Sequence, residues 1–303
     1  MLISWFKRCW RACKPTDKLT VLWALATLPL AAAAVPESCR KVPPHLSRRL
    51  LITLHSVGLG SLALFLALTP GTRNRCASFV RRWYPAALMP FFFKELYYLV
   101  PAVNPNDVDS TLLGWEYAML GQRPRLWLEQ YQSPIVTEIL FLSYASYYFL
   151  PVLTAASLYA RGKPKEFDRY IFLLMLNFYT AFALYFAMPA LGPRAALSHR
   201  FKGDLKGLFF ARHVERAVSF MEGRQRDGFP SLHTQIGLTI AMYLAERKDG
   251  RLKFALPLGL GMMLSALYCR YHYVPDIFAG MAVTGLIFLT YRKLHRALDG
   301  QAE

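Results

Sequence analysis

The chain has few charged residues for its length, and acidic residues are the scarcest of them. Charged residues make up 18% of the 303 positions, whereas hydrophobic residues make up 54%. A soluble domain of this size usually carries more charge and a weaker apolar bias. The 36 Lys and Arg residues outnumber the 19 Asp and Glu residues and leave a formal net charge of +17. The composition therefore argues against an ordinary soluble domain and favours contact with anionic lipid headgroups.

Several other signals are also absent. No basic helix or recognised nucleic-acid motif accompanies the positive charge, so we expect no nucleic-acid partner. No internal repeat or low-complexity segment divides the chain. Neither a metal-binding pattern nor a disulfide framework is formed by the five cysteines, which are Cys9, Cys13, Cys39, Cys76 and Cys269. We interpret them as free thiols, with acylation of the first two beside a membrane as the alternative.

What the chain does contain is a series of long apolar blocks. A bilayer core needs about 20 apolar residues per helix, and backbone polar groups in lipid must be satisfied internally. We therefore predict an all-α fold, a polytopic transmembrane helical bundle of about eight spans. The expected spans are residues 19–35, 50–69, 84–102, 134–160, 168–189, 229–246, 252–270 and 274–293. The number falls to 6–7 if the first block is a cleaved signal peptide or if one span is interfacial.

The distribution of positive charge predicts which side each loop faces. One side, formed by the N-terminus, residues 70–83, 161–169 and 246–253, and the C-terminal tail, carries 20 of the 36 Lys and Arg residues. Short loops rich in Lys and Arg stay in the cytoplasm, so both termini are expected there. The residues that oppose this assignment are Arg40, Lys41, Arg48 and Arg49.

Two short stretches place a histidine at one end of each of two neighbouring apolar segments. Residues 228–234 read GFPSLHT and carry His233, and residues 270–280 read RYHYVPDIFAG and carry His272. The chain between them is long enough to cross a bilayer, turn at residues 246–251 and return. Both histidines are then expected on the same face of the membrane.

These histidines and their neighbours are the residue types of a phosphoryl-transfer site. Asp276 lies four residues after His272, on the same helix face, and a carboxylate bonded to one ring nitrogen leaves the other free as a nucleophile. His233 is placed to protonate a leaving oxygen. Ser231 is placed to cap the helix that carries His233, where free N–H groups form an anion site. A buried His–Asp pair without chemistry is the alternative.

Basic residues are the remaining candidates, because phosphoryl transfer depends on positioning and on neutralised phosphate oxygens. Arg194 closes the fifth span, and Arg270 precedes His272 by two residues; the alternative for each is an ordinary cation at a helix end. Lys94 lies beside Glu95 in the middle of the third span, where charges are costly and usually paired or functional. An ion pair with neighbouring helices is the alternative there.

Two segments between the spans are expected on the outer face. Residues 104–133 mix tryptophan and glutamate with leucine, which predicts an amphipathic surface helix with its tryptophans at headgroup depth. Residues 190–228 are basic and polar, with glycine breaks, and are placed to cover the site as a lid. A belt at the membrane interface is the interpretation for Tyr268, Tyr271 and Tyr273.

Residues 185–290 resemble the type 2 phosphatidic acid phosphatase superfamily, with a weaker likeness back to about residue 105. The family's central signature, Pro-Ser-Gly-His, is matched by residues 230–233, with Leu232 in place of glycine. Its last signature is Ser-Arg, five residues, His, three residues, Asp, and here Ala266 replaces the arginine. The first signature, Lys, six residues, Arg-Pro, is absent, and residues 192–194 (GPR) stand in its place.

The resemblance implies a membrane enzyme that cleaves a lipid phosphate ester without metal or cofactor. It implies a phosphohistidine on His272, with His233 as the acid for the leaving group and Asp276 as the orienting carboxylate. Arg270 would substitute for the missing arginine. The departures resemble the branch of inositol phosphorylceramide synthases and, more distantly, of sphingomyelin synthases. Enzymes of that branch pass a phospho-headgroup to a lipid alcohol rather than to water.

On this interpretation residues 1–36 are an anchor or signal-like segment, 37–160 are N-terminal spans, 161–295 are the catalytic core and 296–303 are a cytoplasmic tail. We expect an integral protein of a bacterial inner membrane with its site facing the periplasm. The alternative function is a membrane transporter or lipid scramblase. The charges of Lys94 and Glu95 favour it, whereas the gathering of both histidines on one face disfavours it.

Overall fold

The computed structural model describes residues 9–34, 48–69, 72, 74–121, 128–201, 203–222 and 226–300. These residues form helices and connecting loops, with no strand among them, which confirms the predicted all-α class. The helices are α2 Pro15–Ala34, α3 Arg48–Leu68, α4 Arg75–Val103, α5 Asp109–Leu120, η1 Glu129–Tyr131, α7 Pro134–Ala160, α8 Pro164–Ala187, α9 Pro193–Ala196, η2 Ser198–Arg200, α10 Ala211–Glu222, α11 Leu232–Glu246, α12 Leu252–Tyr268 and α13 Val274–Asp299. Outside the described residues lie Cys39, Arg40, Lys41, Trp127 and Gly223.

Each of the eight predicted spans coincides with a helix of the structure, namely α2, α3, α4, α7, α8, α11, α12 and α13. Within the described residues, the helices long and apolar enough to cross a membrane are α4, α7, α8 and α13. With 15 and 17 residues, α11 and α12 fall short of the about 20 that a bilayer core requires. The helical membrane class is therefore supported, and the count of eight spans stays a prediction.

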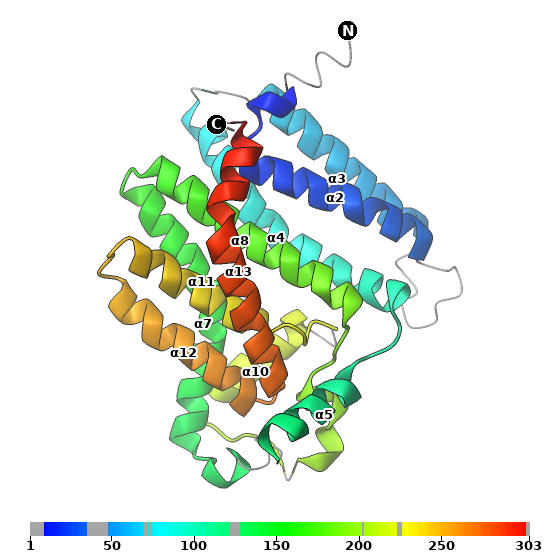
Figure 1. Ribbon diagram of the computed structural model, residues 1–303, viewed down its shortest axis with the longest axis vertical. Helices are drawn as coiled ribbons and strands as arrows, with labels where there is room; N and C mark the ends of the chain where they lie inside the picture. Colours follow the sequence, from blue (N-terminus) through cyan, green and yellow to red (C-terminus); the bar gives the residue numbers. More distant parts are fainter. Residues whose placement is uncertain are drawn as a thin grey trace.

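Helix α8 lies at the centre of the bundle (Figure 1). It packs against α2, α4, α7, α11 and α13. Of its apolar window, 61% is buried, the largest share among the four candidate spans. Its aromatic side chains Tyr170, Phe172 and Phe182 are fully buried and pack in one core with Tyr243 of α11. This core holds α11 and α13, the helices that carry the two candidate histidine stretches, against the rest of the bundle.

Large apolar side chains also cover the outside of the bundle. Phe149 and Leu153 on α7 are each 63% exposed, Leu264 on α12 is 61% exposed and Leu289 on α13 is 78% exposed. Soluble monomers rarely expose apolar side chains over several helices in this way, whereas lipid-facing surfaces do. The exposed residues therefore agree with the membrane class inferred from composition.

The beginning of α2 and the end of α13 lie together at one end of the molecule (Figure 1). Lys18 Nζ donates a hydrogen bond to the carbonyl of Leu298 at 2.5 Å. With 26 residues, α13 is about 39 Å long, and it separates this end from His272. The described terminal segments thus lie opposite the histidine stretches, as the charge pattern predicts. Which end faces the cytoplasm stays a prediction.

A short helix, α5, occupies part of the segment that was expected to be one amphipathic helix over residues 104–133. It ends at Gly121, whose φ of +62° gives the left-handed cap that glycine adopts most readily. Leu112 and Glu116 are buried, whereas Trp115 and Tyr117 are exposed. The helix is therefore shorter than expected and has no distinct apolar and polar faces, and its depth relative to a membrane stays a prediction.

Candidate active site

Three stretches of the chain are joined by backbone hydrogen bonds at the end opposite the terminal segments. The amide of Gly228 donates to the carbonyl of Ala190 at 2.8 Å, and the amide of Arg194 donates to the carbonyl of Arg270 at 2.7 Å. The amide of Ser231 donates to the carbonyl of Asp276 at 3.0 Å. The GPR, PSLH and His272 stretches that the sequence singled out therefore meet in one place.

Two glycines allow this close approach. Gly192 has φ of +80°, and a Cβ there would lie 2.2 Å from the carbonyl oxygen of Tyr271. A Cβ at Gly280 on α13 would lie 2.7 Å from the carbonyl oxygen of Ser231. Real Cβ atoms do not approach oxygen this closely, so a larger residue at either position would push the stretches apart. The sequence thus sets their spacing through these two positions.

Replacing Gly192 by alanine should destabilise the protein by about 2 kcal/mol or more, because it adds a steric collision to left-handed strain. Gly162 provides the matched control: its φ is +65°, but a Cβ there would meet no atom within 4 Å. Gly162→Ala should therefore cost only about 1 kcal/mol from strain alone. Unfolding of both purified variants in detergent measures the difference, and equal losses would contradict the role of the close approach.

His272 lies in the connection between α12 and α13, and one of its ring nitrogens is fully engaged. Its Nδ1 lies 2.8 Å from the carbonyl oxygen of Gly228 and 3.5 Å from Oδ2 of Asp276. A carbonyl oxygen only accepts hydrogen bonds, so Nδ1 carries the proton. This tautomer leaves Nε2 with its lone pair. The carbonyl of Gly228 is a partner that spacing alone did not reveal.

Asp276 is fully buried in the first turn of α13. Its Oδ2 accepts a hydrogen bond from the amide of Tyr273 at 2.6 Å, which closes a capping interaction at the helix start. The carboxylate is therefore held by its own backbone while it faces His272. This geometry is what orientation and charge stabilisation of a histidine ring require.

His233 lies in the first turn of α11, and its ring packs between two tyrosines. The ring centroids are 3.9 Å from Tyr144 and 4.2 Å from Tyr147, and 5.9 Å from His272. The Nε2 atom of His233 has no hydrogen-bond partner among the described residues. The stacking fixes the ring, and a buried nitrogen without a partner is available to a bound substrate. The expectation that the two histidines meet is confirmed.

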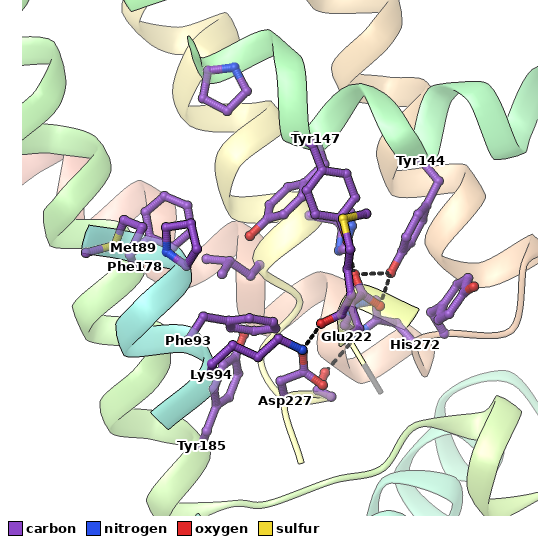
Figure 2. Close-up of a pocket in the computed structure, with 18 of the residues that line it drawn as sticks. Met89, Phe93, Lys94, Tyr144, Tyr147, Phe178, Tyr185, Glu222, Asp227 and His272 are labelled. Carbon is purple, nitrogen blue, oxygen red and sulfur yellow. Dashed lines mark hydrogen bonds between the residues drawn. The ribbon is translucent and has the colours of Figure 1, made fainter. Parts of the chain in front are cut away.

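Both histidines line a cavity of about 870 Å³ that extends into the bundle between α4, α7 and α8. Its inner part is apolar, with Met89, Phe93 and Phe178 among its walls, and its polar part contains the histidines (Figure 2). Helix α10 packs against α7 and closes one side with its last residues. The predicted lid segment, residues 190–228, therefore contributes to the cavity wall. An apolar pocket with a polar end suits an amphiphilic substrate.

The lid segment is anchored by Glu138 on α7. The carboxylate accepts hydrogen bonds from four consecutive backbone amides at the start of α10, at 2.5–3.2 Å, and the donors are Leu208, Phe209, Phe210 and Ala211. A negative group at a helix N-terminus is favourable because the free amides and the helix dipole both point to it. This contact fixes where α10 begins and therefore where it meets the cavity.

Arg194 lines both cavities near the histidines, whereas Arg270 lines the smaller one. Arg194 lines the main cavity, where it donates to the hydroxyl of Tyr271 at 3.2 Å and forms an ion pair with Glu215. Arg270 lines a smaller cavity of about 220 Å³ and pairs with Glu129 at 3.0 Å. Among the described residues, Arg270 is not part of the main cavity wall. Of the two arginines, Arg194 is therefore the one that shares the main cavity with the histidines.

Lys94 and Glu95 point to different parts of the molecule. Lys94 lines the main cavity and donates to the carbonyl of Met221 on α10. Glu95 is buried against His55 of α3, and the two side chains form an ion pair. Successive helix residues differ by about 100° in direction, so one can face the cavity while the other faces α3. Contacts with neighbouring helices, the alternative that the sequence left open, are therefore present for both residues, and Lys94 lines the main cavity as well.

Ser231 and three tyrosines take structural positions. Ser231 caps α11, as predicted, and its hydroxyl accepts from the amide of Thr234 at 3.3 Å; it does not line the main cavity. Tyr268 and Tyr273 are buried, and Tyr271 stacks on Tyr144 at 4.4 Å. The interpretation of the tyrosines as an interfacial belt was wrong, because Tyr268 and Tyr273 are buried in hydrophobic clusters and Tyr271 lines the main cavity.

Asp109 is a residue of the site that sequence reasoning missed. Its carboxylate accepts from the amides of Leu191 and Gly192, each at 2.9 Å, and from the hydroxyl of Tyr273 at 3.0 Å. It thus joins the start of α5 to the GPR stretch and to the residue beside His272. Its partners lie 82, 83 and 164 residues away in the chain, so no local spacing could indicate them.

The fold and the site together define an apolar helical bundle with a paired-histidine cavity. A family model described as the PAP2 superfamily matches residues 110–290, more than half of the chain. The chain therefore belongs to the PAP2 superfamily. Membership supports a phosphatase-type enzyme associated with a membrane. No curated protein and no solved structure matches the chain.

Two of the three departures from the family signatures are single residues, and the structure places both. Leu232, in place of glycine, is 4% exposed and lines the main cavity. Ala266, in place of arginine, is fully buried, and its carbonyl accepts from the amides of Tyr271 and His272 at 3.0 Å each. The position of the family's arginine is therefore taken here by a small buried side chain.

Proposed function

We propose that this protein is a membrane lipid phosphatase or phosphotransferase that works through a phosphohistidine on His272. The observation that carries the proposal is the pair of histidine rings, 5.9 Å apart, at the polar end of a cavity with an apolar interior. The cavity accommodates a lipid chain in its apolar part and a phosphate ester beside the histidines. The inositol phosphorylceramide synthase-like branch is our proposal for its place in the family.

In the first step, Nε2 of His272 attacks the phosphorus atom of the lipid phosphate ester. The bond from phosphorus to the ester oxygen breaks, and His233 gives a proton to that oxygen. Arg194 is placed to neutralise the phosphoryl oxygens, since its guanidinium suits bidentate phosphate binding. Asp276 and the carbonyl of Gly228 hold the ring and favour its positive charge. The product is a phosphohistidine and a released alcohol.

In the second step, an oxygen nucleophile attacks the phosphorus atom of the phosphohistidine and regenerates His272. Water as the acceptor makes the protein a phosphatase, and an alcohol makes it a phosphotransferase. The scheme requires no metal ion, so a chelator should not change the rate. We further propose that the site faces the periplasm of a bacterial inner membrane, on the basis of the charge distribution in the loops.

The pH dependence of the first step should follow from the charges around His272. Burial by itself lowers the pKa of His272, but the hydrogen bond and charge of Asp276 and the charge of Asp227 raise it above its ordinary value. Only the ring with an unprotonated Nε2 attacks phosphorus, so the rate should fall as the pH drops through this raised pKa. Asp227→Asn should shift that acidic limb to lower pH. A pH–rate profile of phosphoenzyme formation that is unchanged in the variant would contradict this assignment.

Product analysis on the purified protein tests the proposed function. The donors are labelled phosphatidate, isoprenyl diphosphate and phosphatidylinositol, each with and without a lipid alcohol. Free phosphate alone identifies a phosphatase, and a new phospholipid that appears only with the alcohol identifies a phosphotransferase. A protein that forms neither product from any donor is not the enzyme proposed, and transport would then be the function to test.

A further inference from the structure

Two further carboxylates line the main cavity: Glu222 has no part in the reaction described above, and Asp227 acts there only through its charge on the pKa of His272. Glu222 is the last residue of α10, and Asp227 immediately precedes Gly228, whose carbonyl holds His272. Both line the cavity between its apolar interior and the histidines (Figure 2). Each is close enough to His272 for its charge to act on the other group. Both are partly exposed, and a carboxylate in a largely apolar cavity is costly unless it is hydrogen-bonded or paired with a charge.

The hydroxyl groups of two tyrosines fix the position of Glu222. Tyr148 donates to Oε1 of Glu222 at 2.5 Å, and Tyr144 donates at 3.4 Å to Oε2. Tyr144 also stacks on His233, so one side chain contacts both the carboxylate and the proposed acid. The carboxylate is therefore held at a defined place beside the histidines, and its remaining lone pairs are directed into the cavity.

A phosphate group does not suit this part of the cavity. Lys94 provides one positive charge near the two carboxylates, and it already donates to the carbonyl of Met221. Phosphate oxygens and carboxylates repel one another, so the phosphate belongs beside Arg194 and the histidines. Burial and the charge of Asp227 raise the pKa of Glu222 to about 7. Carboxylates so placed are acceptors for neutral donors, and hydroxyl groups fit them.

The apolar part of the cavity determines what kind of molecule carries the hydroxyl group. Its walls are built from α4, α7 and α8, and they include Met89, Ile171, Leu174 and Phe178. A hydrocarbon chain placed there directs its polar end past Glu222 and Asp227 toward His272. Water needs no such apolar wall, whereas a lipid alcohol uses both the wall and the carboxylates.

We propose that Glu222 and Asp227 form an acceptor site that binds the hydroxyl group of a lipid alcohol, so that the phosphoryl group passes to this alcohol rather than to water. This rests on the phosphohistidine proposed above. The hydroxyl oxygen attacks phosphorus, the P–N bond breaks, and its electron pair returns to Nε2 of His272. The hydroxyl proton goes to the carboxylate of Glu222, and it returns through solvent to His233, which lost a proton in the first step.

The test separates the two half-reactions in the purified full chain. Phosphate-labelled dioleoyl phosphatidate serves as the donor and dodecanol as the acceptor in mixed micelles. Phosphoenzyme, inorganic phosphate and dodecyl phosphate are measured for the unchanged protein and for Glu222→Gln. The variant should form phosphoenzyme and inorganic phosphate within about threefold of normal. It should lose dodecyl phosphate formation about tenfold or more, because the alcohol loses a charged hydrogen-bond acceptor.

Glu166→Gln is the matched control, since it removes a carboxylate that pairs with Arg247 at 3.4 Å outside the cavity. It should leave all three products unchanged. Asp227→Asn is a second test variant and should also reduce the share of dodecyl phosphate among the products. Three outcomes would overturn the acceptor site alone. Glu222→Gln could lose both products equally, or it could form dodecyl phosphate as the unchanged protein does. The unchanged protein could also release only inorganic phosphate. Absence of phosphoenzyme in the unchanged protein would overturn the proposed function and this site with it.

Discussion

His272→Ala should lose phosphoenzyme formation and turnover by at least about a thousandfold, because the attacking atom itself is removed. Among the described residues, the other histidine of the main cavity is His233, whose ring packs against Tyr144 and Tyr147 and lies 5.9 Å from that of His272. Phosphohistidine contains a P–N bond, so the label on the protein should be stable in alkali and lost in acid, unlike an acid-stable phosphoester. Turnover that survives the substitution would exclude His272 as the nucleophile.

The same experiment needs a measure of folding, since His272 is buried and bonded to Gly228. Its removal leaves that carbonyl without its donor, at a cost of about 1–3 kcal/mol. The variant should therefore remain extractable in detergent, with a slightly lower unfolding temperature. His213→Ala is the control, because His213 is exposed on α10 and does not line the cavity. It should retain normal turnover.

His233→Ala should slow attack on alkyl phosphate esters by roughly 100- to 10,000-fold, the usual contribution of a general acid. An alkoxide is a poor leaving group and requires the proton that Nε2 of His233 supplies. A nitrophenyl phosphate leaves as a stable anion, so its rate of phosphoenzyme formation should fall by no more than about tenfold. Rapid-quench measurement of phosphoenzyme formation isolates this first step from the later one.

The comparison of the two esters also controls for damage to the site. His233 is stacked on two tyrosines, and alanine leaves a cavity between their rings. General distortion would slow both esters alike, whereas loss of the proton affects the alkyl ester selectively. Equal losses on the two esters would therefore count against His233 as the acid.

The sequence predicted the helical bundle and the meeting of the histidines because both depend on local patterns. The apolar blocks that predict helices carry their own backbone hydrogen bonds, and α11 and α12 form a tight antiparallel pair through close contact of Gly237 with Gly259. A hairpin of this kind returns the chain to the face it left. His233 and His272 follow from that geometry without knowledge of other helices.

The positions of Arg194 and Arg270, the candidate phosphate ligands, were harder to predict because they depend on side-chain direction in irregular segments. Arg270 is two residues from His272, but its backbone has φ of +67°, and its side chain stacks on Phe201 with a centroid distance of 4.1 Å. A positive φ is uncommon at a residue other than glycine, so the two-residue spacing from His272 did not indicate where the Arg270 side chain points. Arg194, by contrast, follows the tight turn at Gly192 and reaches the main cavity.

Residues that act across long chain separations were not predictable at all. Asp109, Glu138 and Glu222 each bind partners 70 or more residues away, and each looks like an ordinary acidic residue in its local sequence. The scarcity of acidic residues is the signal that the sequence offers: with only 19 Asp and Glu residues in the chain, each one inside the helical bundle is a candidate for a structural or functional role. The intramembrane charges drew attention to Lys94, but only the fold shows that Glu95 serves a contact with His55.

The contacts of Asp109 also bear on the order in which the protein is made. Its carboxylate joins residues at the start of α5, in the GPR turn and in Tyr273, which precedes the last helix of the chain. Synthesis delivers these partners one after another, and Tyr273 follows Asp109 by 164 residues. The site is therefore incomplete throughout most of membrane insertion. Until Tyr273 has been translated, a nascent chain lacks one of the three hydrogen-bond donors that hold the Asp109 carboxylate.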